Sequence, residues 1–154
     1  MSRRRIRRPK DQEEMYKVLA DRDELGGIFS SFKDIFMLAG IVGFMNKKRK
    51  TFTSSLEQIH WNVFNSETDE TVINAVALAE TGDLTIINTD DEAFDRKITI
   101  YEEYAAGGLE YLYDKIMENP RYALDNYFDF LKSMEKEVSI EKKNLKDIYN
   151  ILSI

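Results

Sequence analysis

The sequence predicts a mainly α-helical protein: a compact single-domain bundle of five to seven helices with at most a small β element. Its 154 residues suffice for one hydrophobic core. Nine Phe, eight Tyr and one Trp stand in a chain that is 43% hydrophobic, which is typical of a packed domain. Seven Gly and two Pro are too few for the many turns of a sandwich or barrel. In most segments the apolar residues recur at steps of three or four, the spacing of one helix face.

Two helices are predicted in the first third of the chain. The first begins near Asp11, which has capping-box spacing with Glu14, and ends at Gly26–Gly27. The second begins after Ser31, and its apolar residues over 32–42 lie on one face.

The middle of the chain is less regular. Residues 56–64 fit both a strand and a helix, and the choice stays open. The next helix begins at Thr68 or Asp69 and ends at Gly82, where a helix end favours a left-handed residue. The short β-branched run 84–87 predicts a small strand.

Three helices are predicted in the remainder. A long one covers residues 89–116 and is stopped by Asn119–Pro120. Within it, Gly107–Gly108 costs about 1 kcal/mol per glycine relative to alanine. Either the helix breaks there or another backbone packs against the pair. The last two helices cover residues 124–134 and 145–152.

Residue counts exclude much catalytic chemistry. The chain has no cysteine, which excludes thiolate catalysis, disulfides and zinc fingers. His60 is its one histidine, and beside Ile59 and Trp61 a structural role is favoured over catalysis. Neither a phosphate-binding glycine loop nor a nucleophile elbow is present. The sequence therefore predicts no metal or cofactor, and it favours binding over enzyme activity.

One enzyme pattern remains as an alternative. Asp83, followed by an apolar run and then Asp95 and Lys97, matches the loose spacing of magnesium-dependent nucleases. There, two carboxylates hold the metal and a lysine stabilises charge at the attacked phosphate. The match is weak because charged residues are frequent and because residues 92–97 have the pattern of a helix start.

The net charge of −6 divides unevenly. Residues 1–50 carry 13 Lys/Arg against 7 Asp/Glu, and residues 51–154 carry 9 against 21. We therefore expect a basic N-terminal arm, residues 1–10, ahead of one helical domain, residues 11–154. Basic clusters bind nucleic-acid phosphates. The candidate nucleic-acid-binding residues are Arg3, Arg4, Arg5, Arg7, Arg8, Lys10, Lys47, Lys48, Arg49 and Lys50. Two alternatives are a solvated arginine tail and a tail folded back onto the acidic body.

The sequence predicts a cytoplasmic protein without membrane contact. The basic start is followed by polar residues, so no signal peptide is expected. The most apolar run, Ile35 to Met45, is too short to span a bilayer.

Several blocks resemble the DNA phosphorothioation-associated protein 4 family, also called dnd system-associated protein 4. The similarity runs from about Ile6 to Leu112, and no similarity is recognised after Pro120, in the C-terminal helices within 121–154. Ala106 stands where the family is expected to have Asn. The blocks that carry the resemblance are Ile6–Lys10, Gly27–Phe29, Lys33–Ala39, Gly43–Phe44, Ile59–Phe64, Ile73–Asp83 and, most specific, Tyr101–Glu110.

The resemblance implies a setting in prokaryotic genome defence, in systems that place sulfur in the DNA backbone or restrict DNA lacking that mark. It supplies no catalytic residues. The leading hypothesis is a non-enzymatic accessory protein that binds DNA, or protein components of a modification or restriction complex, through its basic N-terminal region. The alternatives are a metal-dependent nuclease subunit and a dimeric protein–protein adaptor, with Gly107–Gly108 allowing close helix approach in a homodimer.

Overall fold

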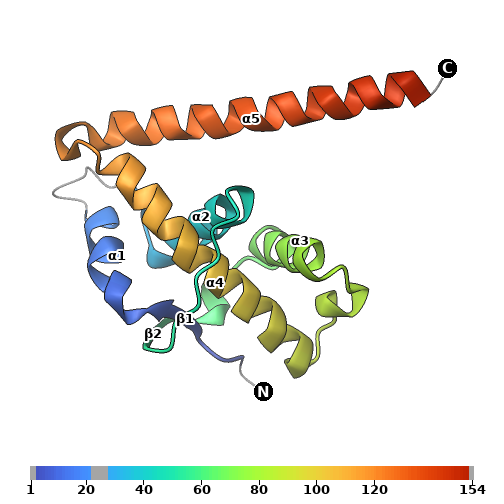
Figure 1. Cartoon of the computed structure of the whole chain (residues 1–154). Coiled ribbons are helices and arrows are strands. Elements are labelled where there is room, and N and C mark those ends of the chain that lie inside the picture. Colours follow the sequence, from blue (N-terminus) through green and yellow to red (C-terminus); the bar gives the residue numbers. More distant parts are fainter. Residues whose placement is uncertain (1–2, 22–27, 153–154) are drawn as a thin grey trace. The chain divides into compact units, whose positions relative to one another are not determined.

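The computed structural model describes residues 3–21 and 28–152. Within these ranges it contains five α-helices and one two-stranded antiparallel sheet, which confirms the predicted mainly α class with a small β element. The chain divides into two compact units, Met1–Tyr113 and Asp114–Ile154. In the first unit, helix α4 is the long central element (Figure 1).

The sheet joins part of the predicted basic arm to the region that was left open between strand and helix. Strand β1, Ile6–Pro9, pairs with β2, Ser55–Ile59, and a bulge lies between Ile6 and Arg8. Ile6 is fully buried. The second half of the expected arm is thus a strand in the core. The region 56–64, which fitted both a strand and a helix, contains strand β2 followed by the 3-10 helix η2, Trp61–Val63.

The first two helices follow the expected order. A 3-10 turn η1, Lys10–Gln12, leads into α1, Glu13–Leu19. The predicted end at Gly26–Gly27 lies outside the described residues. Helix α2, Phe32–Met45, is N-capped by Ser31, whose side chain accepts a hydrogen bond from Asp34 N at 3.3 Å.

Helix α3, Asp69–Thr81, ends as predicted at Gly82, which has a left-handed φ of 66°. The predicted strand at 84–87 is wrong: Leu84–Ile87 forms the 3-10 helix η3. The Asp83 carboxylate accepts hydrogen bonds from both the backbone N–H and the hydroxyl of Thr85. Such local bonds favour a turn over an extended conformation.

Helix α4, Asp91–Ile116, begins where the Asp90 side chain accepts from Ala93 N at 2.7 Å. It continues unbroken through Gly107–Gly108, because other backbone segments pack there. A Cβ at Gly108 would overlap Ala39 O of α2, and one at Gly107 would overlap Lys48 O. The glycine pair therefore serves close packing within one chain, so it is not the dimer contact considered above. The buried stripe of α4 includes Ile98, Tyr101, Ala105, Leu109 and Leu112.

The second unit contains the 3-10 turn η4, Pro120–Tyr122, and helix α5, Ala123–Leu152. The two predicted C-terminal helices are one continuous helix. Residues 123–152 contain neither Gly nor Pro, so nothing in the sequence interrupts the backbone hydrogen bonds. Over residues 3–21 and 28–152, no helix is both long and apolar enough to cross a membrane.

Candidate nucleic-acid interface

Glu102 of α4 binds two of the N-terminal arginines. Its side chain is 1% exposed, and it accepts hydrogen bonds from Arg4 Nη1 and Nη2 at 2.9 and 3.0 Å. It also accepts from the Arg7 backbone N at 2.5 Å and from Arg7 Nη2 at 3.1 Å. Arg4 Nε donates to Asp95 at 2.6 Å. Burial opposes the charge of Arg4, but these carboxylates outweigh it and raise the pKa of Arg4.

Arg3 lies at the beginning of the same helix. Its Nη1 is 3.0 Å from Asp91 Oδ1, and its Nη2 donates to Thr89 O at 2.6 Å. Its guanidinium carbon is 4.4 Å from the ring centre of Phe94, which adds a cation–π contact. The described part of the basic arm thus lies against α4, as in the alternative of a tail folded onto the acidic body.

Arg8 is a core residue. It is 1% exposed, and its guanidinium carbon lies 4.4 Å from the ring centre of Tyr16 and 4.8 Å from that of Phe32. Burial lowers the pKa of Arg8. In this position its guanidinium lies against Tyr16 of α1 and Phe32 of α2 and is out of reach of a DNA phosphate.

In the second basic cluster, residues 47–50, two of the four cations form ion pairs within the protein. Arg49 pairs with Glu80 at 2.6 Å and with Glu103 at 2.9 Å. Lys50 Nζ lies 2.5 Å from Glu110 and 3.8 Å from Asp11. The hydrogen bond to Glu110 raises the pKa of Lys50. Both cations connect the loop after α2 to neighbouring elements.

Four of the ten candidate cations remain available to a phosphate. They are exposed, and none forms an ion pair with a carboxylate of the residues that the structure describes. We call these the open cations: Arg5, Lys10, Lys47 and Lys48. Arg5 donates one long hydrogen bond, of 3.4 Å, to Glu57 O.

Lys47 has an unusual backbone conformation. Its φ of 55° makes it the one non-glycine residue with a positive φ in the described ranges. It is the residue after the C-cap of α2, and its N–H donates to Phe44 O while Lys48 N–H donates to Gly43 O at 2.8 Å. These are the two bonds of a Schellman motif, in which glycine is the usual left-handed residue. Cations here complement the helix dipole, but that effect does not require lysine at the strained position.

Replacing Lys47 with glycine is therefore expected to raise the free energy of unfolding by about 1 kcal/mol, because glycine adopts a positive φ without strain. Lys48→Gly is the matched control, since it removes the same charge at a residue without a positive φ. It is expected to lower the stability slightly. Urea denaturation of both variants measures the difference, and equal shifts would contradict the assigned strain.

A family model for DNA sulphur modification system-associated protein 4 matches residues 5–150. The chain belongs to that family. No curated protein and no solved structure gave a match. The resemblance read from the sequence is confirmed. Its expected end near Leu112 was too early, because the match to the family includes nearly all of α5.

The nuclease pattern is not assembled in this member of the associated-protein-4 family. Asp95 is bound to Arg4, while Lys97, two residues further along α4, is 2% exposed and donates to Asn74 Oδ1 at 2.9 Å. Residues two apart on a helix do not share a face. Asp83 caps η3. No group of three potential metal ligands occurs among the residues described.

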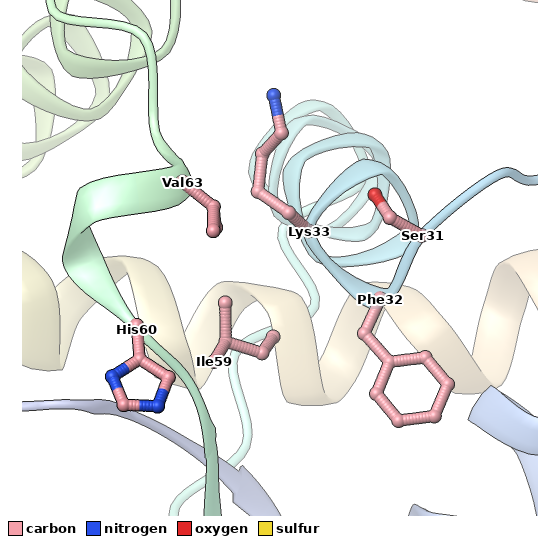
Figure 2. A pocket seen from close by; sticks show the side chains of 6 residues that line it. All are labelled: Ser31, Phe32, Lys33, Ile59, His60 and Val63. Carbon is pink, nitrogen blue, oxygen red and sulfur yellow. The ribbon is translucent and has the colours of Figure 1, made fainter.

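The lone histidine of this family member borders a hollow of about 360 Å³ at the start of α2 (Figure 2). Phe32, Ile59 and Val63 make its lining mostly apolar. The Ser31 hydroxyl accepts from the backbone N–H of Asp34 and so serves as the N-cap of α2.

The residues missed at the sequence level are the partners of the arginines on α4, three carboxylates and one hydroxyl. Asp91, Asp95, Thr99 and Glu102 recur at steps of four, four and three, and each accepts from an N-terminal arginine. That spacing places them on one helix face. It is visible in the sequence and indicates an internal binding site for the basic arm.

Proposed function

We propose that the protein is a non-enzymatic accessory component of a DNA sulphur modification system, acting in the cytoplasm. It binds the DNA backbone, or a complex assembled on DNA, through the open cations. The observation that carries the proposal is the Lys47–Lys48 pair. Both lysines are exposed, and the loop holds Lys47 in a conformation that glycine adopts more easily. Strain retained at a surface residue supports a role for its side chain.

The position of the open cations also supports this proposal. Lys50 lies near both Asp11 and Glu110, so the loop that carries Lys47 and Lys48 lies beside the segment that carries Lys10. Lys10 N donates to Ser54 O, which fixes that segment against the residues before β2. Together these contacts gather cations from two distant stretches of sequence near one region of the surface.

The remaining cations contribute less to binding in this proposal. Arg4 and Arg7 would have to leave the buried Glu102, which costs several kcal/mol once a buried charge loses its partners. The acidic residues elsewhere repel DNA and thereby orient it toward the open cations. Binding is then sequence-independent and sensitive to salt.

The test is a salt titration of DNA binding by Lys47→Gln/Lys48→Gln. If both lysines contact phosphates, affinity falls and the slope of log K against log salt becomes shallower by about 2. Fluorescence anisotropy with a labelled duplex measures both quantities.

The matched control is Lys132→Gln/Lys136→Gln, which removes two exposed charges from α5. Equal losses of affinity in the two variants would show that only net charge matters. A wild-type protein that binds no duplex at low salt would overturn direct DNA contact. Duplexes of one sequence with and without backbone sulfur then determine whether the modification itself is recognised.

A further inference from the structure

Helix α5 carries a strict seven-residue repeat. Five positions, each seven residues after the last, are occupied by Leu124, Leu131, Val138, Leu145 and Leu152. The positions three residues further along are Tyr127, Met134, Glu141 and Ile148. Eight of these nine positions are apolar. This is the a and d pattern of a coiled coil, sustained over four heptads.

The backbone is compatible with this pattern over its whole length. All 30 residues of Ala123–Leu152 are helical, which corresponds to about 45 Å at 1.5 Å per residue. A strict seven-residue repeat needs an uninterrupted helix, and α5 provides one. At its beginning, Leu124 and Phe128 are 49% and 52% exposed. An apolar stripe of this length is stable in water when another helix covers it.

We propose that α5 pairs with α5 of a second copy of this chain in a parallel two-stranded coiled coil. One pair of charged positions beside the stripe supports this occupant. With Leu124 as the first a position, Glu137 is the g position of the second heptad and Lys142 is the e position of the third. A parallel pair in register places Glu137 of one copy opposite Lys142 of the other. The twofold symmetry of the dimer forms the same acid–base pair a second time. At this pair of positions the helix is therefore self-complementary.

Glu141 is the one charged residue among the nine a and d positions. A single polar residue at such a position fixes the register of a coiled coil and lowers its stability. In a parallel dimer the two copies of position 141 face each other, so the like charges weaken association. Glu141→Leu is accordingly expected to strengthen the dimer.

Light scattering during size-exclusion chromatography tests the pairing on the full chain. The wild type and the control Ser139→Asp/Asn150→Asp are expected to be dimers, whereas Leu131→Asp/Leu145→Asp is expected to be a monomer. The two double variants add the same charge on different helix faces. A wild type that stays monomeric at its highest soluble concentration overturns the proposal, as does a dimer that survives the substitutions at 131 and 145. Glu141→Leu, which restores an apolar position, must dissociate at a lower concentration than the wild type.

Cysteine cross-linking tests the orientation, because the natural chain has no cysteine. Leu145→Cys is expected to form a disulfide between copies under mild oxidation, since equivalent a positions of a parallel pair lie within disulfide reach. Asn150→Cys, at the outer f position, is the control and should cross-link far more slowly. A dimer in which neither variant cross-links overturns the parallel arrangement. None of these outcomes depends on DNA binding.

Discussion

Gly108→Ala is expected to lower the free energy of unfolding by about 3 kcal/mol, since overpacking against rigid backbone is costly. The added Cβ would overlap Ala39 O and the Gly43 backbone of α2. Neither obstacle can rotate away as a flexible side chain could, so α2 and α4 would have to separate. The sign of the effect is itself diagnostic, because alanine at an open helix position stabilises by about 1 kcal/mol relative to glycine.

Gly82→Ala is the control for this experiment. Gly82 also needs glycine, but for its φ of 66°, and an added Cβ would meet no atom within 4 Å. The strain there costs about 1 kcal/mol. Thermal and urea unfolding compare the two variants. If Gly108→Ala proved as stable as the wild type, the close approach of α2 and α4 would be wrong.

Glu102→Gln is expected to destabilise the protein by about 3 to 4 kcal/mol, the cost of removing one partner from a buried ion pair. The carboxylate binds the side chains of Arg4 and Arg7 and the backbone N–H of β1. A glutamine amide would place donor hydrogens against these donors. Loss of the interaction should release β1 from α4 and unmask cations that are bound in the wild type.

Glu110→Gln serves as the comparison. Its pair with Lys50 is about half exposed, with side chains 45% and 37% accessible. Surface pairs of this kind contribute about 1 kcal/mol or less. Urea unfolding monitors stability, and hydrogen exchange of the β1 amides reports on release of the strand. A similar loss in both variants would mean that burial of Glu102 adds nothing.

Local signals in the sequence predicted much of the fold. The cap at Ser31, the left-handed Gly82 and the apolar spacing of α4 each depend on residues a few positions apart. The break predicted between residues 134 and 145 was wrong because the polar stretch there contains no helix breaker.

The candidate site was harder to predict, because its charges are decided by tertiary contacts. Ten cations in two clusters were equivalent in the sequence. In the fold, Arg8 is buried between rings, Arg4 and Arg7 bind Glu102, and Lys47 and Lys48 stay exposed. The placement of Asp91, Asp95 and Glu102 on one face of α4 is the sequence signal that could have set Arg3, Arg4 and Arg7 apart in advance.

The pairing of β1 with β2 and α4 has a consequence for biosynthesis. The first strand finds its partners about 50 and 95 residues later in the chain, at Ile59 and Glu102. Contacts of such high sequence separation form late, because a long loop must close first. Until α4 has been synthesised, Arg4 and Arg7 of a nascent chain therefore lack their carboxylate partner Glu102. Once folded, the acidic face of α4 competes with any nucleic acid for the same arginines, because both offer negative oxygens to them.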